Sequence, residues 1–394
     1  MNKLHKILFF LFKVINKIVI FISKGNKKLI LSDKNNSFIN FFDVHDFIFR
    51  PTGINYYNKI LFVEQNYNTL YSVYKLIDKK YCDYIVIKSD RDFENIKKIY
   101  NYKIIVVNSE FNFLDKISKK HQIIVCIWHA LGAFKKVGKY NSLVYKNEIL
   151  KKYYESFFDF LIVSGSEIVN LYSDAFNIEK KFVLPLGLPQ VDKYFDNDYL
   201  IKKRKDFIKE FNFLKHKKIY GIFPTFQEKK HGIYWNINFK KLASYLNDDE
   251  IIVFKLHPSI PLSKTDFYEV ENKIINLSHV KDLISLCEFE SIITDYSSLI
   301  FEAMIFDINL VFLRNKYVES ERELWINYEN LPGNIIDTSA SNVNLENAIV
   351  SNLRNNFRNK ELYEKFYNEN VGECDSKSSE RIAKFLLDKL SENK

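Results

Sequence analysis

Short runs of β-branched and other apolar residues recur along this chain of 394 residues and alternate with segments of helical periodicity. In the first half the runs fall at 59–65, 83–89, 102–110, 121–128, 158–166 and 181–187. In the second half they fall at 218–226, 250–258, 291–298 and 309–313. The runs are continuous and do not alternate with polar residues, which is typical of parallel strands covered by helices on both faces. The pattern predicts an α/β protein.

The stretch 190–217 separates two such units, because it is charged, helix-prone and without a strand pattern. A domain typically holds roughly 100–200 residues, so the chain is long enough for two. We expect domains at 29–200 and 215–394, each built on a parallel sheet, with a cleft between them. The expected helices include 145–156, 166–176, 238–247, 280–288 and 299–306, and further helices fill 341–390.

Residues 1–28 carry a stripe of lysines. At about 100° per residue, Lys6, Lys13, Lys17 and Lys24 fall on one side of a helix, and Leu, Ile, Phe and Val cover the rest. The lysines interrupt the apolar stretch of about 20 residues that a spanning helix needs, and no signal-peptide cleavage site follows. The pattern predicts an amphipathic helix in a membrane interface. A helix packed on the protein's own surface is the alternative.

The formal net charge of +9 predicts an anionic partner. The lysines are dispersed and no known nucleic-acid-binding module is present, so an anionic membrane surface or a phosphate-rich substrate is favoured and nucleic acid is not. The four cysteines form no CxxC pair and have no histidine at ligand spacing; they are Cys82, Cys126, Cys287 and Cys374. Neither a disulfide framework nor a metal site is predicted, and a reducing compartment is expected.

Polar side chains gather where four of the predicted strands end. The segments are "WHALGAFKKVG" from residue 128, "FPTF" at 223–226, "KLHP" at 255–258 and "TDYSS" at 294–298. Open parallel sheets bind ligands beyond the carboxyl ends of their strands, so function is expected there. Each motif alone is weak evidence.

Two of these motifs place a histidine at a strand end, His129 in the first unit and His257 in the second. Either ring could simply be packed in a core. Two imidazoles that face one cleft could instead divide the work, one taking a proton and the other donating a hydrogen bond or positive charge.

The segment "ITDYSSLIFEAM" opens the predicted helix 299–306 with Asp295, Ser297 and Ser298, and Glu302 follows one turn later. One such residue suffices to cap a helix, which is the plain alternative. All of them together favour a site for a nucleotide diphosphate and its ribose. Neither the GxGxxG fingerprint nor the P-loop is present, which argues against dinucleotide binding and P-loop chemistry.

In combination the motifs resemble the CDP-glycerol glycerophosphotransferase family of teichoic-acid and capsule polyol-phosphate transferases. The resemblance runs from about residue 59 to about residue 340 and rests on five ordered segments. These are "WHALGAFKKVG", "SEIVNLYSDAFNI" with "LPLGLPQVD", "FPTF", "KLHP" and "ITDYSSLIFE". The resemblance implies two facing Rossmann-like domains, a glycosyltransferase-B-like fold, with the acceptor on the side of 29–200 and the nucleotide on the side of 215–394.

The resemblance also implies an activity. His129 corresponds to the general base that takes a proton from an acceptor hydroxyl, which attacks the β-phosphate of a CDP-polyol. Lys255 and His257 match the pair that neutralises the pyrophosphate, and Ser297 with Ser298 match phosphate-binding hydroxyls. CMP would leave, and a phosphodiester would remain.

Further positions join the expected substrate-binding set. Glu302 matches an acidic residue against the nucleotide's sugar, and Thr225 lies in the segment that lines the nucleotide pocket. The set is completed by Trp128, Ala130, Leu131, Gln190, Pro224 and Asp295. Two positions depart from the family pattern. Gln190 stands where the family usually has arginine, and Ala130 replaces glycine, which puts glycerol as the polyol in doubt.

The implied partners are a CDP-polyol donor, a lipid-linked or polymeric acceptor and an anionic membrane surface, with no cofactor. The expected location is the cytoplasmic face of the cell membrane, held peripherally. Two other readings stay open. One keeps the fold but uses a nucleotide sugar, as a glycosyltransferase would; the other is a membrane-associated binding protein without catalysis.

Overall fold

The computed structural model describes part of the chain. The described residues are 57–65, 69–87, 92–96, 98–110, 122–141, 154, 157–225, 235, 237–256, 270, 273–280, 288–314, 323–338, 344–355 and 358–392. The predicted helix in 1–28 and the catalytic candidate His257 lie outside these residues, as do most of the predicted helices 145–156 and 280–288.

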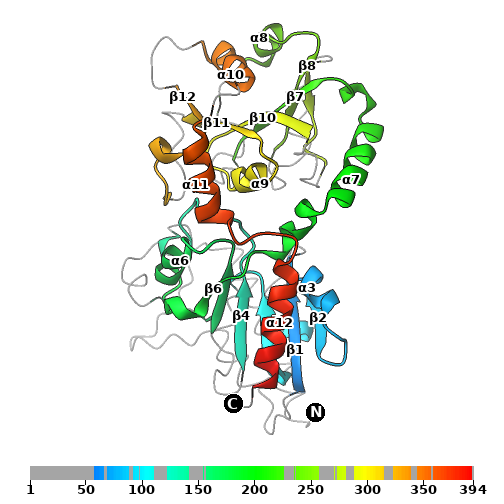
Figure 1. The fold of residues 1–394 in the computed structure, drawn as a ribbon, viewed down its shortest axis with the longest axis vertical. Coiled ribbons are helices and arrows are strands. Elements are labelled where there is room, and N and C mark those ends of the chain that lie inside the picture. Colours follow the sequence, from blue (N-terminus) through cyan, green and yellow to red (C-terminus); the bar gives the residue numbers. More distant parts are fainter. Residues whose placement is uncertain are drawn as a thin grey trace, which may run out of the picture.

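The first sheet has six strands in the order β2-β1-β3-β4-β5-β6, and every neighbouring pair is parallel (Figure 1). The strands are β1 (Tyr57–Glu64), β2 (Cys82–Val86), β3 (Tyr102–Val107), β4 (Ile123–Ile127), β5 (Phe160–Val163) and β6 (Val183–Pro185). The prediction of a parallel sheet in the first unit is confirmed.

The second sheet also has six parallel strands, in the order β12-β11-β10-β7-β8-β9. The strands are β7 (Lys218–Phe223), β8 (Glu250–Phe254), β9 (Ile274–Asn276), β10 (Phe289–Thr294), β11 (Asn309–Arg314) and β12 (Asn334–Asp337). The sequence pattern predicted four of these and missed β9 and β12, because each of the two contains only two consecutive apolar residues, Ile274 with Ile275 and Ile335 with Ile336.

Helices cover the sheets and link them. They are α3 (Tyr71–Leu76), α4 (Phe93–Ile96), α6 (Val169–Ala175), α7 (Asn197–Glu210), α8 (Phe239–Ser244), α9 (Leu299–Ile305), α10 (Leu345–Arg354), α11 (Lys360–Val371) and α12 (Ser378–Ser391). Short 3-10 helices lie at Ile99–Asn101, Gly138–Tyr140, Lys180–Phe182, Pro189–Phe195, Asn212–Leu214 and Tyr328–Asn330. Among the described residues, none of these helices is long and apolar enough to cross a bilayer.

Strand β1 shows why its apolar run is continuous. Ile60 and Phe62 point into one buried apolar cluster, and Leu61 and Val63 point into another on the opposite face of the sheet. All four are fully buried. Because successive side chains of a strand point to opposite faces, a strand covered on both sides needs an apolar residue at every position.

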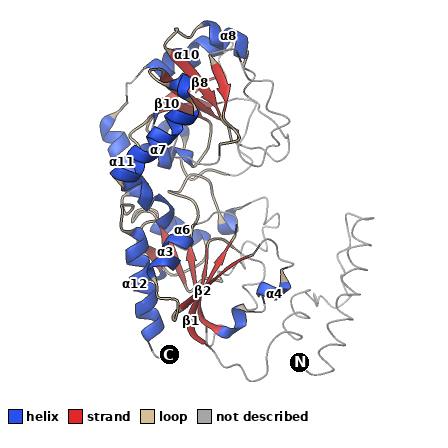
Figure 2. Cartoon of the chain, turned by 90° about the vertical axis from the view of Figure 1, so that its right-hand side faces the viewer, coloured by secondary structure: helices blue, strands red, loops and turns tan. Residues whose placement is uncertain are grey.

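The chain passes between the two sheets more than once (Figures 1 and 2). Helix α7 leads from the first sheet to the second. The last helix, α12, returns and packs against α3, β1 and β3 of the first sheet. The domain boundaries predicted near 200 and 215 stay a prediction, but the helix at the end of the second predicted domain lies on the first sheet.

Candidate functional site

His129 lies at the carboxyl edge of the first sheet, two residues beyond β4. Its Nδ1 is 2.9 Å from the main-chain oxygen of Asn108, which follows the neighbouring strand β3. A carbonyl oxygen only accepts hydrogen bonds, so Nδ1 carries the proton. In the neutral ring Nε2 then holds the lone pair. His129 is half-buried and can act as a base through Nε2.

The loop after His129 is held by contacts from several elements. The main-chain nitrogen of Gly132 donates to Ser164 Oγ (2.8 Å), and its oxygen accepts from the Tyr172 hydroxyl (2.8 Å). The nitrogen of Ala133 donates to Asn370 Oδ1 in α11 (3.0 Å). Gly132 has a φ of +58°, a conformation that favours glycine. The sequence feature that begins at Trp128 is therefore a rigidly held turn.

Several predicted substrate-binding residues of this segment are buried. Trp128 is 4% exposed and packs against Phe176 and the His129 ring, and Leu131 is 1% exposed. Ala130 is partly buried. Trp128 and Leu131 therefore pack in the protein interior beside His129. Their role in substrate binding stays a prediction.

Gln190 lies beside His129. Its Nε2 donates to the main-chain oxygen of His129 (3.1 Å), and its Oε1 is buried with no hydrogen-bond partner in the described part of the chain. Gln190 belongs to the 3-10 helix that follows β6. The position where the family usually has arginine is thus adjacent to the candidate base.

Asp295 joins the ends of β10 and β7 in the second sheet. It is 3% exposed, and its Oδ1 accepts from the main-chain nitrogens of Thr225 (3.0 Å) and Tyr296 (2.8 Å) and from the Thr225 hydroxyl. Its Oδ2 accepts from Trp235 Nε1 (3.3 Å). The carboxylate and Thr225 therefore hold the loop after β7, where the buried Pro224 also lies.

Ser297 and Ser298 precede α9. Ser297 Oγ accepts from the main-chain nitrogen of Leu299 (3.3 Å), whereas the side chain of Ser298 makes no capping hydrogen bond to the helix. Both serines are half-buried. The predicted helix 299–306 is confirmed at Leu299–Ile305, with the serines at its start.

Glu302 lies one turn into α9. Part of the residue reaches the surface, but Oε2 is buried and has no hydrogen-bond partner among the described residues. Burial raises the pKa of this carboxyl to about 7. A buried carboxyl oxygen without a donor can accept a hydrogen bond from a ligand hydroxyl.

Lys255 follows β8 at the same edge of the second sheet. It is 8% exposed, and its Nζ donates to the main-chain oxygen of Val280. His257, its predicted companion, lies outside the described residues.

The His129 turn contacts the start of α9 across the two domains. A Cβ atom added to Gly132 would lie 2.3 Å from the Phe301 ring, so the two are in close contact, and Lys135 Nζ is 5.0 Å from the centre of the Tyr296 ring. Leu131 belongs to the same apolar cluster as Phe301. The structure therefore brings together the motifs that the sequence placed in separate domains.

Main-chain hydrogen bonds fix this contact between the domains. The nitrogen of Lys136 donates to the oxygen of Glu323 (2.8 Å), and the nitrogen of Trp325 donates to the oxygen of Phe134 (3.0 Å). An ion pair joins Lys136 Nζ to Glu323 Oε2 (2.8 Å). The turn that carries His129 is held from both domains.

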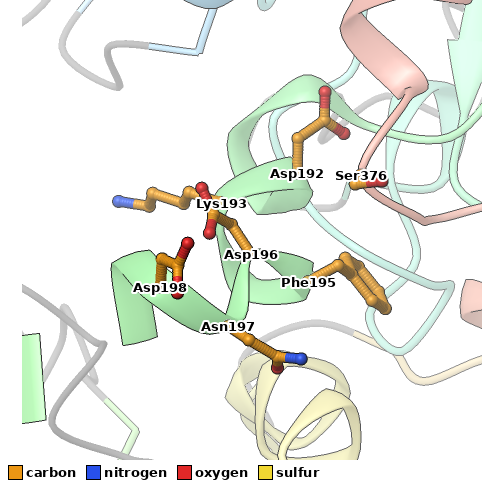
Figure 3. A pocket seen from close by; sticks show the side chains of 7 residues that line it. All are labelled: Asp192, Lys193, Phe195, Asp196, Asn197, Asp198 and Ser376. Atoms are coloured by element: carbon orange, nitrogen blue, oxygen red, sulfur yellow. The ribbon is translucent and has the colours of Figure 1, made fainter. Parts of the chain in front are cut away.

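A hollow of about 530 Å³ lies elsewhere, at the start of α7 (Figure 3). It is lined by Asp192, Lys193, Phe195, Asp196, Asn197, Asp198 and Ser376. Two of its carboxylates serve helix ends: Asp192 accepts from the first nitrogens of α12, and Asp196 from that of Tyr199 in α7. None of the predicted site residues lines this hollow.

In the described part of the chain, no group of three or more His, Cys, Asp and Glu side chains could hold a metal ion. Two polar residues near His129 were missed by the sequence reasoning, Glu64 at the end of β1 and Asn108 after β3. Their signal was the polar residue that ends each apolar run, in "FVEQ" and "VVNSE".

Comparison with known proteins adds a family. The sequence profile described as CDP-Glycerol:Poly(glycerophosphate) glycerophosphotransferase matches residues 38–388. The teichoic acid ribitol-phosphate polymerase TarL of Staphylococcus aureus is 26% identical over 334 residues, covering 79% of this chain and 57% of that protein. A teichoic acid ribitol-phosphate primase of Bacillus spizizenii is 30% identical over 283 residues, covering 68% of this chain and 70% of that protein. The chain spans a little over half the length of TarL.

The fold is similar to a solved structure of the wall teichoic acid polymerase TagF. The TM-score is 0.66 at 20% sequence identity, over 85% of this chain and 90% of that chain. The likeness confirms the predicted fold of two facing Rossmann-like domains.

Proposed function

Because this chain belongs to the CDP-glycerol:poly(glycerophosphate) glycerophosphotransferase family, we propose that it transfers glycerol phosphate or ribitol phosphate from a CDP-polyol to a hydroxyl group of a lipid-linked or polymeric acceptor and releases CMP. The observation that carries the proposal is the position of His129. Its Nδ1 is bound to a carbonyl oxygen, and its turn contacts the helix that begins after Ser298.

The proposed reaction is an in-line displacement at phosphorus. Nε2 of His129 takes the proton of the acceptor hydroxyl, whose oxygen forms a bond to the β-phosphorus. The bond from that phosphorus to the bridging oxygen breaks, and the electron pair leaves with CMP. Phosphoryl transfer asks the protein mainly for positioning and charge stabilisation, which a base at a domain interface can supply without covalent catalysis.

The donor is assigned to the second domain. The hydroxyls of Ser297 and Ser298 bind phosphate oxygens, and Lys255 with His257 neutralises the diphosphate. Glu302 accepts a hydrogen bond from the ribose, which gives its buried Oε2 a partner. Thr225 and Pro224 line the nucleotide pocket from the loop after β7.

Measurement of CMP release from CDP-glycerol and CDP-ribitol with a lipid-linked acceptor tests the proposal. We expect His129→Ala to lower turnover by about 10²–10⁴-fold, the usual contribution of a general base. We expect His257→Ala to lower turnover as well. The matched control is His216→Asn, because His216 is exposed on the loop before β7 and adopts a positive φ that asparagine tolerates.

Full turnover in both the His129 and the His257 variants would contradict the roles proposed for these two histidines, and the absence of CMP release by the wild-type protein would favour a binding protein. Release of UDP from UDP-sugars, with no CMP from either CDP-polyol, would favour the glycosyltransferase reading instead.

We also propose that residues 1–28 and the face formed by α3 and β2 lie against an anionic membrane surface at the cytoplasmic side. Four large side chains in these two elements and in the loop between them are exposed by 41–52%: Tyr71, Leu76, Tyr81 and Val86. Three lysine ammonium nitrogens lie 3.4–4.9 Å from the centres of tyrosine rings; they belong to Lys75, Lys79 and Lys80. Tyrosine with lysine is the composition that membrane interfaces favour.

Sedimentation with vesicles tests the membrane proposal. Since each lysine near an anionic surface contributes about 1 kcal/mol, reversing Lys75, Lys79 and Lys80 to glutamate should lower binding to phosphatidylserine vesicles by at least about tenfold. The same reversal of the exposed lysines of α7, at Lys202, Lys205 and Lys209, is the control of equal charge. Equal losses in the two triple variants would show net charge acting alone and contradict the proposed face.

A further inference from the structure

A buried carboxylate lies two strands away from His129. Glu64 ends β1, is 3% exposed and accepts hydrogen bonds from two main-chain nitrogens, those of Thr69 (3.1 Å) and Leu70 (2.7 Å). The Tyr84 hydroxyl donates to its Oε2 (3.2 Å). The shortest contact is from Asn108 Nδ2 to Oε1, at 2.5 Å. A buried carboxylate persists only when donors surround it in this way.

The carboxylate fixes the side chain of Asn108. Asn108 is fully buried; its Nδ2 donates to Glu64, and its Oδ1 accepts from the main-chain nitrogen of Gln65 (3.3 Å). A reversed amide would present oxygen to the carboxylate and NH₂ to a nitrogen, so only one orientation is satisfied. Asn108 is thereby held at both ends of its amide.

The main-chain oxygen of the same residue meets His129. Strands β1, β3 and β4 are neighbours in the sheet, so their carboxyl ends place Glu64, Asn108 and His129 in a row. The row runs from the carboxylate through the amide to the main-chain carbonyl and then to Nδ1 of the ring.

We propose that Glu64 and Asn108 are positioning residues for His129. Glu64 holds Asn108, and the carbonyl of Asn108 holds the imidazole in the Nδ1–H tautomer with Nε2 turned to the acceptor hydroxyl. Neither residue touches the substrate. The inference rests on the proposed function of His129 as the general base.

Glu64→Gln tests the link with little change of shape. In one orientation the new NH₂ group faces the donor Asn108 Nδ2, and in the other it faces the nitrogen of Leu70, so in either case the cluster that fixes Asn108 loses a hydrogen bond together with the negative charge. We expect kcat for CMP release to fall by about 10–100-fold, as when a hydrogen-bond partner of a functional histidine is removed. The KM for the CDP-polyol should stay within about twofold, because donor binding is not involved.

Nitrogen NMR of ¹⁵N-histidine-labelled protein gives a readout that a merely structural role would not move. The wild-type His129 signal, assigned by its loss in His129→Asn, should show the Nδ1–H tautomer. In Glu64→Gln that tautomer should lose population to the Nε2–H form. Asn108→Ser is the second variant, because it keeps the carbonyl but removes the amide, and it decides the matter if Glu64→Gln does not fold.

Gln122→Ala is the matched control. Gln122 is 1% exposed and donates to the oxygens of Ile99 and Tyr102 (2.8 Å each), at the opposite end of β4 from His129. Its loss should cost stability and leave the His129 tautomer unchanged.

A wild-type tautomer and a wild-type kcat in the folded Glu64 and Asn108 variants would overturn the inference while leaving the general base in place. Failure of the proposed function is seen separately, as full turnover in His129→Ala, because the tautomer is measured without turnover.

Discussion

Glu302 shows how burial alone changes what a side chain can do. Its Oε2 has no hydrogen-bond partner among the described residues, and burial raises the pKa of the carboxyl to about 7 from an ordinary value of 4.5. Near neutral pH the group is therefore divided between acid and carboxylate. A ribose hydroxyl would donate to the carboxylate form, so ligand binding and proton loss should favour each other.

Glu302→Gln should reveal the raised pKa as a pH-dependent stability difference. The folded protein binds the proton more tightly than the unfolded chain, so protonation stabilises it fully below about pH 4.5. The stabilisation is lost as pH rises towards 7, at about 1.4 kcal/mol per pH unit at most. Urea unfolding at pH 5 and pH 8 should show wild type weakening against the neutral glutamine variant. A difference that is the same at both pH values would contradict the raised pKa.

Single residues were predictable where their own chemistry marked them. His129 stands out because a titratable ring follows an apolar run. Glu64 and Asn108 were missed because their meaning depends on β1 lying beside β3, and one sequence does not give strand order. Asp295 was expected to face a ligand, yet all its described partners are protein donors from the loop after β7 and its own neighbour.

Strands were predicted better at their centres than at their ends. The run 102–110 gives a strand that stops at Val107, and the run 121–128 gives one that stops at Ile127. After β4 the apolar pattern continues into Trp128, which is also buried, whereas the predicted run 102–110 included the polar residues Asn108, Ser109 and Glu110 beyond the end of β3. At this edge of the sheet a residue can be buried without being paired in a strand. A hydrophobic pattern indicates burial and does not indicate strand pairing.

The start of α12 depends on a carboxylate from another element. Asp192 Oδ1 accepts from the nitrogen of Ser378 (3.2 Å) and Oδ2 from that of Ser379 (2.7 Å). Asp192→Ala would leave two nitrogens at a helix end without this acceptor, so we expect a loss of about 1–3 kcal/mol in the free energy of unfolding.

The control for this prediction is Glu380→Gln. Glu380 is an exposed carboxylate in the first turn of the same helix. Its neutralisation should cost at most about 1 kcal/mol through the helix dipole. Urea unfolding of the three proteins compares them, and equal losses in the two variants would argue against a specific role for Asp192.

Among the described residues, two sets of hydrogen bonds that tie the domains together are noteworthy. One is at the His129 turn, which bonds to Glu323 and Trp325 of the second domain. The other is at the passage from α11 to α12, where Ser164 Oγ donates to the oxygen of Asn370 (2.6 Å). The sequence predicted helices in 341–390 but not that α12 returns to the first sheet. An amphipathic pattern shows that one face is buried, and does not show against which sheet.

Because α12 packs on the first sheet, a cavity in α12 should destabilise that sheet. Leu386 is fully buried in the cluster that α12 shares with β1 and α3. Leu386→Ala should lower the free energy of unfolding by about 2–5 kcal/mol, and the loosening should appear as faster hydrogen exchange in β1 and α3. Leu353→Ala is the matched control, since Leu353 is fully buried in α10, which packs on β10. It should speed exchange in the second sheet instead. If both variants sped hydrogen exchange only in the second sheet, the prediction would be wrong. The packing of α12 would then stabilise the second domain, and the first domain would be stable without it.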